Sequence, residues 1–111
     1  MKSKKTLIEN IKAKLSHFTR EYEIWQFGSS LKSKSYTDVD IGVVVKLPDS
    51  RMCEITETLK SIRNAKVVLP ADYKKQKDSC YHIVVVSKRQ LSRLPIGESI
   101  KRGRIVYKSA A

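Results

Sequence analysis

The sequence predicts an α/β (α+β) fold, in which a mixed β-sheet of about four or five strands carries helices packed on it. Apolar residues recur at helical spacing in two segments, and short β-branched runs alternate with these segments along the chain. Hydrophobic residues make up 41% of the chain and charged residues 31%, which is a globular balance. At 111 residues, the chain (residues 1–111) is expected to form a single domain.

The first half of the chain is expected to supply a helix, two strands and a second helix. Residues 3–20 have the apolar spacing of an amphipathic helix, and 24–27 form an apolar run that ends at Gly28. Residues 39–45 are strongly β-branched and predict a strand. After Pro48, Ser50 is a candidate cap for a helix to about residue 64. The residues expected to face inward from this helix are Met52, Ile55, Leu59 and Ile62.

The second half is expected to alternate short strands with short helices. Residues 66–69 predict a strand that stops before Pro70, and 81–86 form the most apolar strand of the chain. Two short helices are expected over 88–94 and 96–102, the second of them ended by a glycine. The last extended segment covers residues 104–108.

The net charge of +12 favours polyanionic partners such as nucleic acid, nucleotides or an acidic protein surface. This charge is concentrated toward the end of the chain: residues 74–111 hold 10 basic and 2 acidic side chains, against 13 and 9 in residues 1–73. The basic C-terminal third is therefore the part most expected to contact an anion, including nucleic acid. A basic surface without a specific partner remains an alternative reading of the same composition.

Several classes of protein are excluded or disfavoured by composition. No stretch approaches the roughly 20 apolar residues of a membrane span, so no membrane association is expected. The N-terminal segment lacks the apolar core and cleavage site of a secretory signal. Cys53 and Cys80 lie far apart and form no C-x-x-C pair, which argues against a disulfide scaffold or a structural zinc site. A reducing cytoplasm is the expected location.

The residues that carry chemistry lie between positions 25 and 45. An apolar strand runs into Gly28, Ser29 and Ser30, and a short loop leads to a second strand that begins with Asp38 and Asp40. The period of a strand places both carboxylates on one face. Two adjacent carboxylates repel each other unless a cation lies between them, and hard oxygen ligands suit Mg²⁺ with phosphate oxygens completing its shell. An Asp-x-Asp pair alone is more often an exposed strand start; the preceding glycine and serines favour a site.

This pattern resembles the nucleotidyltransferase superfamily, which includes DNA polymerase β, kanamycin nucleotidyltransferase and, at a similar size, the minimal nucleotidyltransferases of prokaryotes. The match is carried by Phe27, Gly28, Ser29, Asp38 and Asp40. A second, weaker similarity to the family lies at residues 100–107, where an isoleucine is followed by a glycine and then a tyrosine.

The resemblance implies a nucleotidyltransferase-like fold and a catalytic site that uses Mg²⁺ or Mn²⁺. Asp38 and Asp40 would then be catalytic residues and metal ligands. Gly28, Ser29 and Ser30 would bind the phosphates of a nucleoside triphosphate. The family usually adds a third carboxylate from a later strand. The residue aligned with it here is His82, which can act as a base but is a poorer Mg²⁺ ligand than a carboxylate.

Two functions are consistent with these features. The first is Mg²⁺-dependent transfer of a nucleoside monophosphate from a nucleoside triphosphate to a hydroxyl acceptor, weak or absent where the third carboxylate is missing. The alternative is a catalytically inactive nucleotidyltransferase-fold protein that binds nucleic acid or a partner protein through its basic surface. Because the chain shows no second domain for an acceptor, a partner chain or a homo-oligomer is expected. The resemblance implies a small helical partner of the HEPN type.

Overall fold

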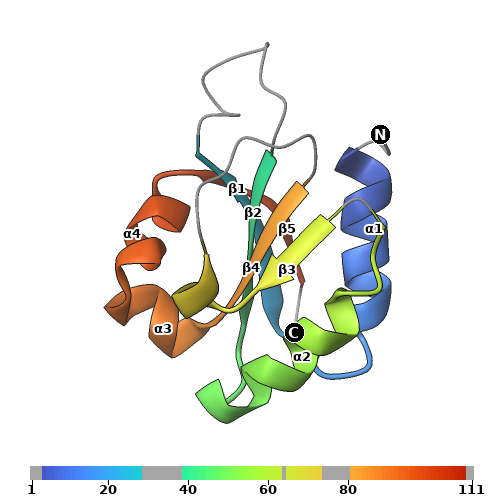
Figure 1. The fold of residues 1–111 in the computed structure, drawn as a ribbon, viewed down its shortest axis with the longest axis horizontal. Helices are drawn as coiled ribbons and strands as arrows, with labels where there is room; N and C mark the ends of the chain where they lie inside the picture. Colours follow the sequence, from blue (N-terminus) through green and yellow to red (C-terminus); the bar gives the residue numbers. More distant parts are fainter. Residues whose placement is uncertain (1–3, 29–38, 64, 74–80, 110–111) are drawn as a thin grey trace.

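The computed structural model describes residues 4–28, 39–63, 65–73 and 81–109, which form a five-stranded mixed sheet with helices on both faces (Figure 1). The predicted α/β architecture is therefore confirmed. The strands are β1 (Tyr22–Phe27), β2 (Val39–Val45), β3 (Ala65–Val68), β4 (Tyr81–Ser87) and β5 (Arg104–Lys108). The helices are α1 (Lys4–Leu15), α2 (Met52–Leu59), α3 (Lys88–Arg93) and α4 (Pro95–Lys101), with 3₁₀ turns η2 (Asp49–Arg51) and η3 (Pro70–Asp72).

The sheet has the strand order β3-β4-β2-β1-β5. β4 pairs in parallel with both β2 and β3, whereas β1 pairs antiparallel with β2 and with β5. β2 and β4 are the central strands, and all of their residues are buried. Burial on both faces explains why these two segments are near-continuous apolar runs in the sequence.

The two faces of the sheet carry separate hydrophobic clusters. Figure 1 shows α1 and α2 over one face and α3 and α4 over the other. On the first face, Leu7, Ile11 and Leu59 pack with the odd-numbered residues of β2 and β4. On the second face, Leu91 and Ile100 pack with Phe27 and the even-numbered apolar residues of β2 and β4. The period of the strands thus assigns each side chain to one face.

Two predicted helices are shorter in the structure than the sequence indicates. α1 ends at Leu15, and a turn follows in which the Ser16 hydroxyl donates to the Ala13 carbonyl, 2.8 Å away. α2 covers Met52–Leu59, and Ser50 makes no capping hydrogen bond because it lies inside the 3₁₀ turn η2. The apolar spacing continued past both helix ends because the turn residues also contribute to the core. The four residues expected to face inward from the second helix are all buried: Met52, Ile55, Leu59 and Ile62.

The start of α3 is stabilised by a capping box that the sequence analysis did not include. The backbone N–H of Gln90 donates to the Ser87 hydroxyl at 3.0 Å, and the backbone N–H of Ser87 donates to the Gln90 side chain at 3.0 Å. The Ser87 hydroxyl also donates to the carboxylate of Asp49. This connects the end of β4, the start of α3 and the turn before α2.

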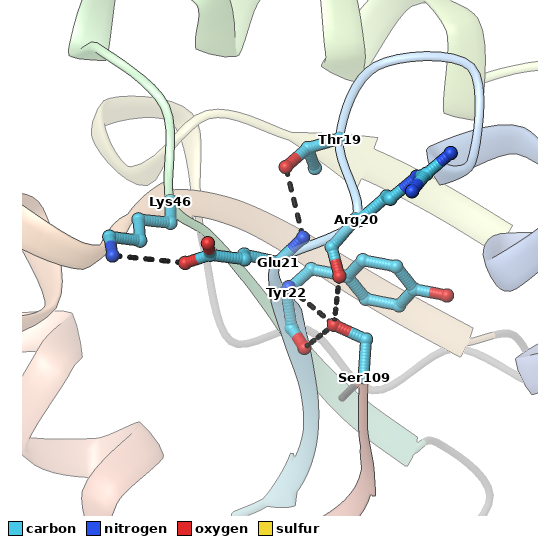
Figure 2. Close-up of polar contacts among 6 residues, drawn as sticks. All are labelled: Thr19, Arg20, Glu21, Tyr22, Lys46 and Ser109. Carbon is cyan, nitrogen blue, oxygen red and sulfur yellow. Dashed lines mark hydrogen bonds and ion pairs between the residues drawn. The ribbon is translucent and has the colours of Figure 1, made fainter. Parts of the chain in front are cut away.

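Ser109 attaches the end of β5 to the start of β1 (Figure 2). Its hydroxyl accepts from the backbone N–H of Tyr22 at 2.9 Å and lies 2.6 Å from the carbonyl of Arg20, to which it donates. Its own N–H donates to the Tyr22 carbonyl at 3.0 Å. The C-terminal end of β5 is therefore held in register against β1.

Burial of the Tyr22 phenol predicts a pH dependence of stability. Burial, together with the neighbouring Tyr107, raises the pKa of Tyr22 from 10.0 to about 12. Below pH 10 the phenol is neutral in both the folded and unfolded states, so it does not affect the pH dependence. Between about pH 10 and pH 12 the unfolded state loses the proton first, so the free energy of unfolding should fall as pH rises. Chemical denaturation across this range should show the fall, and Tyr22→Phe should flatten it.

In the part of the chain that the structure describes, none of the helices has the length and apolar character required to cross a membrane.

Candidate functional site

The candidate site begins where β1 ends and β2 starts. Gly28 follows β1 and has a φ of +81°, a left-handed conformation that L side chains rarely adopt. A Cβ at this position would lie 2.4 Å from Oδ2 of Asp40. Since 2.4 Å is too close for two atoms that are not bonded to each other, only glycine permits the backbone to lie against this carboxylate. The closeness of the Asp40 side chain therefore explains why this position of the predicted Gly-Ser motif is a glycine.

Asp40 is a buried carboxylate, with 2% of its surface exposed. It lies opposite Phe27 in the pairing of β1 with β2, on the sheet face that carries α3 and α4. The hydroxyl of Tyr73 donates to Oδ1 of Asp40 at 3.0 Å. A buried carboxylate needs such donors because burial otherwise penalises its charged form.

Tyr73 is the residue of this site that the sequence analysis missed as a neighbour of Asp40. It follows η3, and its ring packs beside Phe27 with centroids 6.0 Å apart at 44°. Its hydroxyl is thus directed at a carboxylate 33 positions earlier in the sequence. No local pattern signals such a contact, because it depends on how the chain returns to the sheet after β3.

His82 lies directly beside Asp40 on the neighbouring strand. The parallel register of β2 and β4 pairs Asp40 with His82, and the two residues share the same face of the sheet. His82 is also buried, with 5% of its surface exposed. His82 is therefore a neighbour of Asp40, and its correspondence to a third carboxylate stays a prediction.

The other predicted site residues lie outside the described residues. These are Ser29, Ser30 and Asp38, so the proposed phosphate contacts and the second metal ligand stay predictions. Among the residues that the structure describes, no group of three His, Cys, Asp or Glu side chains could hold a metal ion. The described part of the site therefore consists of one buried carboxylate, with a glycine, a tyrosine and a histidine around it.

The described basic residues of the C-terminal third lie in or directly beside α3, α4 and β5. Three of them have acidic neighbours: Arg89 lies 3.6 Å from Asp49, Lys101 3.7 Å from Glu98 and Lys108 3.7 Å from Glu23. The first two pairs are exposed and therefore contribute little to stability, whereas Glu23 of the third pair is largely buried. Binding of nucleic acid by this surface stays a prediction.

Comparisons with known proteins show a similarity in structure but none in sequence. No family model matches the sequence, and no curated protein matches it. The structure is similar to the crystal structure of spectinomycin adenyltransferase AAD(9) from Enterococcus faecialis with ATP and spectinomycin. The identity is 18%, the TM-score is 0.43, and the match covers 96% of this chain.

The chain spans 48% of AAD(9), about half of its length. At this level of identity and TM-score, the similarity assigns no residue of this chain a role.

Proposed function

We propose that this chain binds a nucleoside triphosphate together with Mg²⁺ or Mn²⁺, and that it transfers a nucleoside monophosphate to a hydroxyl acceptor only weakly by itself. The observation that supports this most is the close packing of Gly28 on the buried Asp40 carboxylate. Glycine adopts a left-handed φ without steric cost, and here it lets the backbone approach a buried carboxylate closely, as a site that holds a ligand through backbone groups requires.

In this proposal Asp40 would supply one carboxylate ligand to a hard divalent cation. A carboxylate oxygen is the type of ligand that Mg²⁺ prefers, and the space that a Cβ would fill at Gly28 lies against Oδ2 of Asp40. Asp38, two positions earlier in the sequence, would supply a second carboxylate on the same face. When bound, the cation would neutralise phosphate charge at the reacting centre.

The residues of the chain would have separate tasks in this proposal. Asp40 would hold the cation, and Tyr73 would keep the carboxylate oriented by its hydrogen bond to Oδ1. Gly28, with Ser29 and Ser30, would place backbone N–H groups and hydroxyls near the triphosphate. His82 stands where a third carboxylate would complete the charge of the site, so we expect slow or no transfer.

A second candidate function follows from His82. An imidazole in register with Asp40 leaves the described site with one carboxylate, which favours binding without turnover. In that case the chain would act through its basic surface, on nucleic acid or on a protein partner. Both functions predict nucleotide or polyanion binding, but only the first predicts that binding depends on a divalent cation.

The test is calorimetric titration of ATP in the presence and absence of Mn²⁺. For the wild type we expect Mn²⁺ to strengthen ATP binding about tenfold, and for Asp40→Asn we expect this gain to disappear, because a neutral amide is a weak ligand for the cation. Glu57→Gln, which removes an exposed carboxylate on α2, is the matched control and should behave like the wild type. If neither Mn²⁺ nor Asp40→Asn changes the affinity for ATP, the metal role is refuted and the second candidate function is favoured.

A further inference from the structure

β5 is an edge strand, with β1 as its only neighbour in the described sheet. Beside it lies a groove of about 500 Å³ between α1 and β5, a volume within the range of binding sites. Its walls include Lys5, Ile8 and Lys12 from α1, and Arg104, Ile105 and Val106 from β5. An exposed strand edge presents backbone N–H and C=O groups that can pair with a further strand.

The groove combines an apolar floor with a cationic rim. Ile105 is the exposed large hydrophobic residue of the described chain, at 42%. Lys12 is partly neutralised, since its ammonium lies 3.3 Å from Glu9 and 4.2 Å from the centroid of the Tyr107 ring. Lys5 and Arg104 are exposed and have no ion pair among the described residues. An occupant would therefore meet two uncompensated cations beside an apolar side chain.

Charge disfavours a second copy of this chain as the occupant. β5 has a cation at each end, Arg104 and Lys108, around the apolar Ile105, Val106 and Tyr107. Antiparallel pairing of two β5 strands about Val106 would place Arg104 of each copy opposite Lys108 of the other. Parallel pairing in register would place each cation opposite itself. Like charges in opposed positions destabilise strand pairs, so these cations disfavour self-association in both arrangements and favour a strand that carries carboxylates.

The C-terminal end of this edge strand is held in place against β1, so it is ordered before a further strand is added. Ser109 holds the C-terminal end of β5 against β1 through its hydroxyl and its N–H (Figure 2). On the inner side, the Tyr107 ring packs beside Tyr22 with centroids 5.7 Å apart. Because β5 is already ordered, only the backbone of the partner segment would lose conformational freedom on binding.

We propose that β5 is a docking edge for an extended, acidic segment of a partner protein, which adds to the sheet as a further strand. Carboxylates of the segment face Lys5 and Arg104, and an apolar side chain between them packs on Ile8 and Val106. Main-chain hydrogen bonds supply affinity in this mode of recognition, and side chains supply specificity. The proposal does not depend on nucleotide chemistry, because the groove lies at the sheet edge and shares no residue with the candidate site.

The test uses a short, capped, fluorescent peptide in which glutamate and valine alternate, with the full chain at low salt. We expect saturable binding by fluorescence anisotropy, with amide NMR shifts concentrated at residues 104–108. The double variant Lys5→Glu/Arg104→Glu should bind at least about tenfold more weakly, because both rim charges are reversed. Lys60→Glu/Arg63→Glu, an equal charge change at exposed positions outside the groove, should bind as the wild type does. Circular dichroism confirms that each variant is folded.

Two further arms separate backbone pairing from general charge attraction. A peptide with lysine in place of glutamate should not bind, and the glutamate peptide N-methylated at alternate amides should lose most of its affinity. Equal binding by the two double variants, or NMR shifts concentrated away from β5 and the facing residues of α1, would overturn the proposal. So would a dimer through β5 in sedimentation velocity, or binding of a single-stranded RNA at this edge in place of the peptide.

Discussion

Gly28→Ala is expected to lower the free energy of unfolding by about 2–5 kcal/mol. Two physical terms add here: a left-handed φ costs a non-glycine residue about 1–2 kcal/mol, and overpacking costs about 1–3 kcal/mol. The second term arises because the new Cβ would lie 2.4 Å from Oδ2 of Asp40. The carboxylate must move, so we also expect the Mn²⁺-dependent gain in ATP affinity to be lost. Urea denaturation and calorimetry measure the two effects.

A double-mutant cycle with Asp40→Ala separates the two terms. With the carboxylate removed, the nearest remaining Asp40 atom to the new Cβ is its own Cβ, at an ordinary 3.5 Å. Gly28→Ala should then cost only the conformational term of about 1–2 kcal/mol. The same cost in both backgrounds would mean that the glycine and the carboxylate do not constrain each other, and the central feature of the site would be wrong.

His82→Asp is the substitution with the largest expected effect on activity. Position 82 is in register with Asp40 on the adjacent strand and on the same face, so an aspartate there would bring two carboxylates together. Without metal they repel each other, and the variant should be less stable than the wild type. Mn²⁺ should reverse this loss, and Mn²⁺-dependent nucleotidyl transfer should rise about a hundredfold, because a charged oxygen ligand replaces an imidazole.

The control for this variant is His82→Asn, which has nearly the same shape as the aspartate but no charge. It should show neither the stabilisation by Mn²⁺ in thermal denaturation nor the gain in transfer. If His82→Asp gains nothing from Mn²⁺, position 82 does not face the cation. Strong transfer by the wild type, unaffected by His82→Ala, would show that another group acts as the third acid.

Most of the fold could be predicted from local patterns. β2 and β4 are β-branched runs buried on both faces, and a run of this type has few alternatives to a central strand. The inward face of α2 was predicted correctly because apolar spacing follows directly from helical geometry. The ends of α1 and α2 were wrong, since apolar residues in the following turns also reach the core.

Less of the candidate site than of the fold could be predicted from the sequence. The Gly28 and Asp40 positions could be singled out because a glycine after an apolar strand and an acid at the start of the next are local signals. The reason why position 28 is a glycine could not be predicted, since it is the close approach of Asp40 across the β1–β2 pair. The contact of Tyr73 with Asp40 could not be predicted either, because this hydrogen bond joins segments that only the packed sheet brings together.

The sequence by itself determined the α/β class, the order of the elements and the positions of the acids, because these depend on periodicity and residue type within short segments. Only the tertiary structure decided which residues are neighbours. The parallel register of β2 and β4 puts His82 beside Asp40, and the strand order leaves β5 at an edge beside α1. Register and strand order are set by the packing of distant segments against one another, and a local pattern carries no record of that packing.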